Sequence, residues 1–178
     1  VAGALGGGTA LTLTGTGYLA GAAVSVGGNP CGGISVDSAT QITCTSPAHA
    51  AGVVDIVVTN SDTQTGTLSS AYTYQPAPVV SSISPIAGAL AGGTTVTLTG
   101  TGFLSGSTIT VGGVACGSIN IISATSASCV TGAHAAGTVD IVFTNADTQS
   151  GTLSNGYTYQ AAPTLASVSP VAGALAGG

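Results

Sequence analysis

Apolar and polar residues alternate along many short stretches of this chain. Residues 95–99 read TVTLT and residues 139–143 read VDIVF, so that apolar side chains recur at every second position. A period of two predicts β-strands with one buried and one exposed face. Turn residues separate these segments, and no segment has the helical period. Between residues 79 and 160 the pattern predicts seven strands: residues 79–83, 94–100, 107–111, 115–122, 126–131, 138–144 and 152–160.

The sequence is an internal repeat with a period of 85 residues. VAGAL at residues 1–5 returns as IAGAL at 86–90 and as VAGAL at 171–175, which gives 86 − 1 = 85 and 171 − 86 = 85. Residues 1–85 and 86–170 are identical at 52 of 85 positions, or 61%, without a gap. Such close similarity indicates two copies of one domain. Seven short strands per repeat predict an all-β chain of small β-sandwiches.

Proline-containing segments mark the expected domain boundaries. Residues 75–78 (QPAP) and 160–163 (QAAP) read as short linkers, because proline lacks the amide hydrogen that a strand interior needs. The expected parts are a first repeat that lacks its first strand, a complete repeat, and the first strand of a following repeat: residues 1–76, 77–161 and 162–178. The absence of Met and the start in mid-pattern favour a segment cut from a longer array.

The motifs of the complete repeat resemble those of the IPT/TIG family. They are SPIAG at residues 84–88, GGTTVTLTGTGF at 92–103, VGGVAC at 111–116, AHAAGTVD at 133–140 and YTY at 157–159. The likeness extends over each repeat from end to end. It implies tandem immunoglobulin-like β-sandwiches, as in cell-surface receptors, bacterial-type surface proteins, accessory modules of carbohydrate-active enzymes and some transcription factors. Such a resemblance predicts the fold better than the function.

Charged residues are nearly absent from the chain. They make up 3% of it, against about 25% in an average globular domain, and all are aspartates: Asp37, Asp55, Asp62, Asp140 and Asp147. Because Lys and Arg neutralise nucleic-acid phosphates and anionic lipid surfaces, a chain with neither is not expected to bind nucleic acid. Its apolar residues never run for the roughly 20 positions that a spanning helix needs, so no membrane insertion of this segment is expected.

Four cysteines form two equivalent pairs, Cys31 with Cys44 and Cys116 with Cys129. Cysteines on two neighbouring antiparallel strands can meet the short Cβ–Cβ distance of a disulfide. The equal spacing in both copies favours one bridge within each repeat. Such bridges imply an oxidising, extracellular setting. The alternative is four buried free thiols, since unpaired cysteines are common in protein cores.

His49 and His134 each lie in the sequence AHAAG, just before a predicted strand. A zinc site made of one such histidine and the cysteine pair of the same repeat would lack the fourth ligand that structural zinc normally has. We therefore expect each histidine to lie in a turn and to bond the backbone.

The remaining candidate ligands are two aspartates in each repeat. Asp55 and Asp140 point outward from a predicted strand, and Asp62 and Asp147 lie in the turn after it. Calcium could use these oxygens, but a rigid calcium site gathers more carboxylates than each repeat offers. Asx-turn hydrogen bonds explain the turn residues without a metal. We expect no metal ion and no other cofactor.

No set of residues in the chain predicts catalysis. Glu, Lys and Arg are absent, which removes the usual parts of paired-carboxylate and phosphoryl-transfer chemistry. No serine lies in a Gly-x-Ser-x-Gly elbow. Tyr18 and Phe103 are expected to cap the core, and the tyrosines of the last strand are expected to pack within the sandwich: Tyr72, Tyr74, Tyr157 and Tyr159. We therefore expect a protein that is not an enzyme.

The neutral surface predicts self-association. Soluble β-proteins normally protect exposed edge strands with Lys or other charges, and this chain has almost none. We expect other copies of the same chain as partners, in a homopolymer or lateral assembly that builds an extracellular filament, sheath or surface layer. The alternatives are a spacer stalk of a bacterial cell-surface adhesin and a glycan-binding accessory module of a secreted enzyme. The low aromatic content of 4% disfavours the glycan-binding module.

Polymerisation by strand donation is a further hypothesis. Residues 162–170 could supply the missing strand to residues 1–76 of the next copy. Residues 171–178, however, repeat residues 1–8 and would compete for the same place. A segment of a longer continuous array is the simpler interpretation of that overlap.

Overall fold

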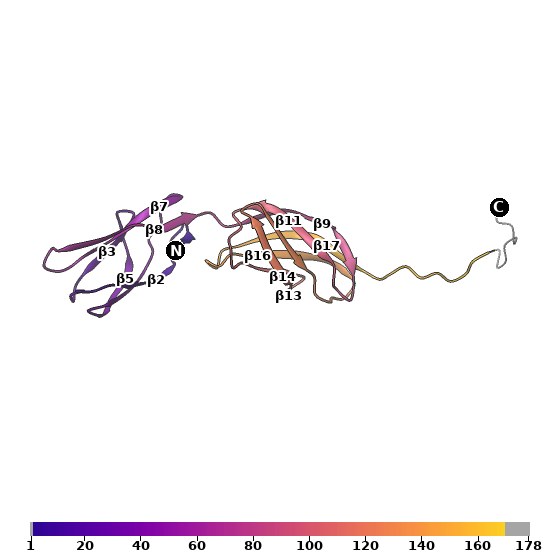
Figure 1. Cartoon of the computed structure of the whole chain (residues 1–178), viewed down its shortest axis with the longest axis horizontal. Coiled ribbons are helices and arrows are strands. Elements are labelled where there is room, and N and C mark those ends of the chain that lie inside the picture. The colour runs from indigo at the N-terminus through magenta and orange to yellow at the C-terminus, as the bar shows by residue number, and fades with distance from the viewer. Residues whose placement is uncertain (1, 170–178) are drawn as a thin grey trace.

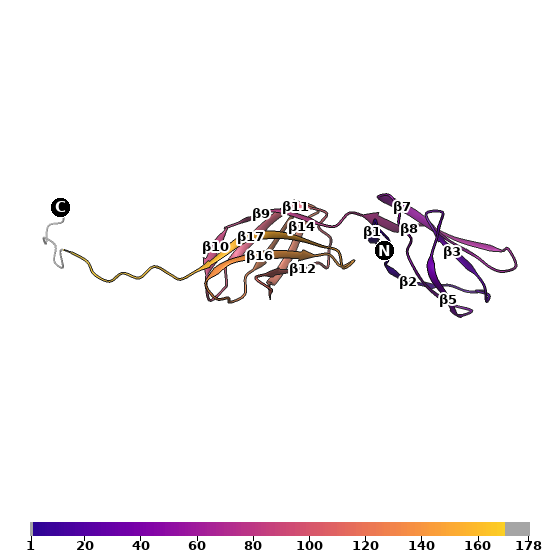
Figure 2. The same ribbon diagram turned by 180° about the vertical axis from the view of Figure 1, so that it is seen from behind.

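A computed structural model describes residues 2–169, which form two β-sandwiches in succession along the chain (Figures 1 and 2). Over these residues every regular element is a strand. No helix in that range is long and apolar enough to cross a membrane. The prediction of an all-β chain with one sandwich per repeat is confirmed.

The first repeat contains eight of the described strands. They are Ala2–Ala4 (β1), Ala10–Thr14 (β2), Ala23–Val26 (β3), Asn29–Pro30 (β4), Gly32–Ser38 (β5), Gln41–Thr45 (β6), Gly52–Thr59 (β7) and Thr65–Gln75 (β8). One sheet has the order β1-β8-β7-β3-β4 and the other has the order β2-β6-β5.

The second repeat contains nine of the described strands. They are Val79–Ser84 (β9), Ala87–Ala89 (β10), Thr95–Thr101 (β11), Thr108–Val111 (β12), Val114–Ala115 (β13), Gly117–Ser123 (β14), Ser126–Val130 (β15), Gly137–Thr144 (β16) and Ser150–Gln160 (β17). The sheet β10-β17-β16-β12-β13 matches its counterpart in the first repeat. The other sheet, β14-β15-β11-β9, has one strand more than its counterpart.

The predicted alternation produces the core of each sandwich. Along β11 buried and exposed residues alternate, with Val96 and Leu98 inside and threonines outside. Phe103 and Phe143 stack in the same core with ring centroids 4.1 Å apart. Removing such side chains from water contributes about 1.5–3 kcal/mol each.

A short parallel strand that the sequence did not predict helps to close each sandwich. After β9 the chain crosses to the other sheet, where β10 pairs in parallel with β17 and Gly88 lies opposite Tyr159. A Cβ atom at Gly88 would overlap the Tyr157 hydroxyl, so only glycine fits beside that ring. β1 pairs with β8 in the same way in the first repeat.

Candidate functional site

The extra strand β9 shows how the edge of the smaller sheet is covered in the second repeat. β9 runs antiparallel to β11, with Ile83 opposite Leu98. A register shift between Thr99 and Gly100 marks a β-bulge, which lets two apolar residues three positions apart face the same side. Val80 and Ile83 accordingly enter the core with 5% and 4% of their surface exposed.

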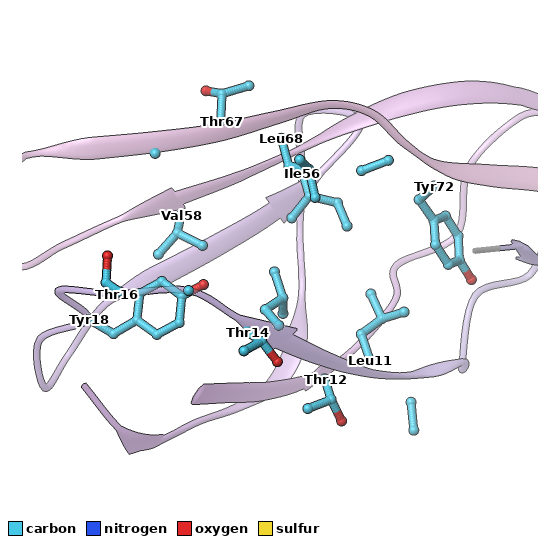
Figure 3. Close-up of a pocket in the computed structure, with 15 residues that line it drawn as sticks. Leu11, Thr12, Thr14, Thr16, Tyr18, Ile56, Val58, Thr67, Leu68 and Tyr72 are labelled. Carbon is cyan, nitrogen blue, oxygen red and sulfur yellow. The ribbon is translucent and has the colours of Figure 1, made fainter. Parts of the chain in front are cut away.

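The equivalent edge of the first repeat is uncovered. β2 pairs with β6 on one side, and no strand among residues 2–169 pairs with its other side. A groove of about 450 Å³ lies there between the two sheets. Figure 3 shows Leu11, Tyr18, Ile56 and Val58 around this space. Leu13 is only half-buried, whereas its equivalent Leu98 is fully buried under β9.

The groove is lined by apolar side chains and by hydroxyl groups. Its lining carries no charged side chain, and the only polar side-chain groups in it are threonine and tyrosine hydroxyls. Apolar walls beside an unpaired strand edge are the two features that an added β-strand uses, for side-chain burial and for main-chain hydrogen bonds. We refer to this feature as the β2 groove.

A second feature is the junction between the two repeats. The side-chain amide of Gln75, at the end of β8, donates to Asp147 Oδ2 at 2.9 Å. The side-chain amide of Gln149 donates to the carbonyl oxygen of Gln75 at 3.2 Å and to Asp147 Oδ2 at 2.9 Å. The turn after β16 therefore holds the end of the first repeat, and we refer to Gln75, Asp147 and Gln149 as the junction triad.

A glycine lets the linker pass close to the second repeat. A Cβ atom at Gly151 in β17 would overlap the carbonyl oxygen of Pro78. The equivalent Gly66 in β8 has no atom within 4 Å of its Cβ position, and its φ angle is not positive. Nothing in the first repeat of a single copy therefore requires glycine at position 66.

The predicted cysteine pairs meet in the structure. Cys44 lies on β6, Cys31 lies between β4 and β5, and their Sγ atoms are 2.8 Å apart. Cys116 and Cys129 are buried at the equivalent places of the second repeat. All four are thiols in this structure, so the two disulfides remain a prediction that the side-chain placement allows.

Three of the four thiols are harder to ionise than a free cysteine, and burial contributes to each shift: it raises the pKa of Cys31, Cys44 and Cys129. Burial, together with the neighbouring Cys31, raises the pKa of Cys44 to about 12. The hydrogen bond with Cys116 and burial likewise raise the pKa of Cys129. As long as they are reduced, Cys44 and Cys129 are poor nucleophiles at neutral pH, because the thiolate is the reactive form. The pKa of Cys116 moves in the other direction, because its hydrogen bond with Cys129 lowers it.

The two histidines bond the backbone, as predicted. His49 Nδ1 lies 2.8 Å from the carbonyl oxygen of Ala50, and its ring stacks on Tyr74 with centroids 5.0 Å apart. His134 makes the same contact with Ala135 and stacks on Tyr159. Between residues 2 and 169 no three His, Cys or Asp side chains come together as metal ligands would.

The turn aspartates make the Asx hydrogen bonds that were predicted. Asp62 Oδ1 accepts from the backbone amide of Gln64 at 3.1 Å, and Asp147 Oδ1 does the same for Gln149. Asp55 and Asp140 have a role that the sequence did not reveal. Their carboxylates accept a backbone amide hydrogen from Ser70 and Asn155, two residues with positive φ on the neighbouring strand, at 2.7 Å each.

Six of the seven aromatic residues are buried. Phe103 and Phe143 lie in the second core, and the tyrosines of the last strands lie in both cores: Tyr72, Tyr74, Tyr157 and Tyr159. Tyr18 is half-buried at the β2 groove, where its equivalent Phe103 is buried. The predicted packing of the last-strand tyrosines is thereby confirmed.

Comparison with known proteins agrees with this geometry. The model of the "IPT/TIG domain" family matches residues 1–75 and 78–161. Human fibrocystin-L (Homo sapiens) is 28% identical over 144 residues, which are 79% of this chain and 3% of that protein. Mouse fibrocystin-L (Mus musculus) is 46% identical over 65 residues, which are 36% of this chain and 2% of that protein. The chain thus spans a few per cent of the length of these relatives.

Among solved structures, the extracellular region of plexin A4 has a similar fold. It superposes with a TM-score of 0.57 at 24% identity, over 89% of this chain and 17% of that chain. Each repeat here therefore has the fold of immunoglobulin-like modules, for which no enzymatic family is indicated.

Proposed function

The chain belongs to the IPT/TIG family, and from this premise we propose that it is a structural, non-catalytic segment of an extracellular filament, sheath or surface layer. The observation that carries the proposal is the junction triad, which joins two like sandwiches end to end. Hydrogen bonds at each junction hold consecutive modules in one orientation. An array of such modules is extended and straight, as the subunit of a fibre or layer must be.

The surface supports assembly with other copies. The five aspartates are the only charged side chains of the sequence, so charge repulsion between copies is weak. Large apolar side chains are exposed on both sandwiches, among them Val53, Leu68 and Ile122. Neutral surfaces with exposed apolar residues favour association over solubility.

An extracellular location is part of the proposal. It is supported by the extracellular region of plexin A4 as a structural relative and by the two cysteine pairs that are placed for disulfides. A spacer stalk of a cell-surface adhesin is the second candidate, because the same junction would hold a stalk straight. A glycan-binding module is less well supported, because six of the seven aromatic rings are buried and cannot form a sugar platform.

Electron microscopy of the native surface material tests the proposal. A structural filament or layer should show an axial repeat of about 30–45 Å per domain, judged from strand length plus turns. Straight particles of constant length that carry a distinct head would instead support the stalk. Isolated, monodisperse monomers at all concentrations would contradict the filament and the layer.

A further inference from the structure

We propose that Asn155 is a site of spontaneous covalent modification, at which the backbone nitrogen of Gly156 attacks the side-chain amide and ammonia is lost. The product is an aspartyl or isoaspartyl residue in strand β17, and the only reagent is water. This inference is independent of the proposed structural function, because it concerns residues inside the second repeat.

The sequence contains the reactive pair once. The chain has five asparagines, and only Asn155 is followed by glycine. Glycine has no Cβ atom, so its backbone nitrogen is unshielded and the adjoining backbone rotates easily. Asn29 is followed by proline, whose nitrogen carries no hydrogen to lose. Asn60, Asn120 and Asn145 are followed by serine, isoleucine and alanine, so attack is least hindered at Asn155.

The structure leaves the side chain of Asn155 free to react. The residue is exposed, and within residues 2–169 no group hydrogen-bonds its side-chain amide. The side-chain amides of Asn60 and Asn145, by contrast, each bond two backbone groups of their own repeat. Those bonds must break before Cγ can approach the next backbone nitrogen. Asn155 has no such barrier.

A β-bulge takes Asn155 out of the regular strand pairing. The ladder between β16 and β17 shifts its register here, so that Asp140 alone lies opposite residues 154–156. Asn155 has a φ of 53°, and its backbone amide donates to Asp140 Oδ1 at 2.7 Å. Because paired residues flank the bulge without holding it, the peptide unit between Asn155 and Gly156 can rotate at a lower cost than one inside the ladder.

Packing explains why glycine stands at position 156. A Cβ atom on Gly156 would overlap the side chain of Leu153, which packs against the core. In the first repeat the equivalent residue is Ala71, and Leu68, the equivalent of Leu153, has 66% of its surface exposed. The inward position of Leu153 thus favours glycine directly after Asn155.

The reaction needs no oxidant or reductant. The Gly156 nitrogen loses its proton to hydroxide and forms a bond to Cγ of Asn155. The Cγ–Nδ2 bond then breaks, and the leaving nitrogen takes a proton from water and departs as ammonia. Water opens the resulting succinimide ring at one of its two carbonyl carbons. Opening at Cγ gives aspartate, and opening at the backbone carbonyl carbon gives isoaspartate, whose backbone is longer by one methylene.

Both products disturb the end of β17. Each adds a carboxylate, which changes the formal net charge from −5 to −6 (−5 − 1). The new charge lies beside Asp140, and like charges repel each other. Isoaspartate also lengthens the strand just before Tyr157 and Tyr159, which are 0% and 1% exposed in the core. We therefore expect this part of β17, with its parallel pairing to β10, to open more easily after modification.

Intact-mass measurement and peptide mapping of the incubated protein test the proposal. The chain should gain the mass of one amide-to-acid conversion, located at residue 155. The rate should increase from pH 6 to pH 9, because the attacking nitrogen must lose its proton. It should exceed the rate at Asn120 at least about tenfold, because a β-branched residue follows Asn120. An unmodified Asn155, or equal rates at the two asparagines, would overturn the proposal.

Comparison with the unfolded chain shows whether the folded molecule itself reacts. The folded chain should react less than about a thousandfold more slowly than the same chain in urea, because a reaction that waits for global unfolding is slower by at least that factor. A larger difference would overturn the argument from the exposed bulge.

Exchanging residues between the repeats provides matched variants. Asn155→Ser with Gly156→Ala introduces the residues of the first repeat and should abolish the modification. Ser70→Asn with Ala71→Gly transfers the pair to the first repeat, where Ser70 has a φ of 52° and its amide bonds Asp55 at 2.7 Å. This variant should react at both sites with similar rates, and circular dichroism checks its folding. A transferred pair that stays intact in the folded chain would contradict the role given to the bulge.

Asn155→Asp separates the new charge from the longer backbone. Hydrogen exchange of peptides that cover residues 157–160 should be slightly faster in Asn155→Asp than in the unchanged chain. In the isoaspartyl form, isolated by ion exchange, it should be at least about tenfold faster, because the lengthened strand pairs less well. Equal exchange in all three forms would contradict the expected opening of β17.

Discussion

At the scale of single residues, the repeat places the same side chain in two surroundings. The Asn145 side chain donates to the carbonyl oxygen of Gly102 and accepts from the amide of Leu104, and Asn60 does the same in the first repeat. Asn145 is 3% exposed and also accepts from the Ser107 hydroxyl, whereas Asn60 is half-buried and next to the β2 groove. Removing a buried side-chain amide leaves its hydrogen-bond partners unpaired inside the protein. This lowers the stability more than removing the same amide near water, where water can replace it.

Asn145→Ala should therefore destabilise the second repeat more than Asn60→Ala destabilises the first. We expect the free energy of unfolding to fall by about 2–3 kcal/mol for Asn145→Ala and by about 1 kcal/mol for Asn60→Ala. Only the change at Asn145 leaves several buried groups without a hydrogen-bond partner. Hydrogen exchange read separately for each repeat in increasing urea measures both values. Equal losses would contradict the argument from burial.

The raised pKa of the Cys44 thiol gives a pH prediction for the reduced protein. Its folded pKa is about 12, above the ordinary value of about 8.5 in an unfolded chain. Folding therefore favours the protonated thiol, so this contribution is complete below about pH 8.5 and decreases as the pH rises toward 12. In the presence of reductant, urea unfolding should give a lower free energy of unfolding at pH 10.5 than at pH 8. Without reductant, a protein with both disulfides has no thiol to ionise and should lack this loss.

At the scale of elements, the sequence predicted most strands because each has one face in the core, which makes apolar and polar residues alternate along it. Every predicted strand from 79–83 to 152–160 appears, with 115–122 divided into β13 and β14. β10 was missed because its three residues, AGA, carry no alternation, and its pairing partner β17 lies about 70 residues away. The junction triad was missed for the same reason, since Gln75 and Asp147 are 72 positions apart. The division into a short first repeat and a complete second repeat stays a prediction, made by comparing the two copies within the sequence.

The uncovered edge predicts a difference in local stability between β2 and β11. In a monomer the backbone amides of β2 are protected by one neighbouring strand and those of β11 by two. We expect peptides that contain β2 to exchange their amide hydrogens at least about tenfold faster than peptides that contain β11, because exposed hydrogen bonds open more easily. Mass spectrometry of deuterium uptake at low protein concentration measures this difference. Equal protection would mean that β2 is covered in the monomer.

At the scale of the whole molecule, shape depends on a few bonds at the junction. The two sandwiches lie end to end (Figures 1 and 2), and the side-chain bonds between them come from the junction triad. Pro76 and Pro78 stiffen the linker by fixing its backbone angles. Without the triad, the proline linker alone would set the angle between the repeats.

Asp147→Ala should therefore make the junction bend more widely, while Asp62→Ala should not. Asp147 accepts a hydrogen bond from Gln75 across the junction, and within its own turn it holds Gln149, which donates to the Gln75 carbonyl oxygen. Asp62 bonds only within its own turn. Small-angle X-ray scattering at low protein concentration should show a broader distribution of end-to-end distances for Asp147→Ala than for the unchanged chain, with the folding of each repeat unchanged. An equally broad distribution for Asp62→Ala would contradict the assignment of the junction to Asp147.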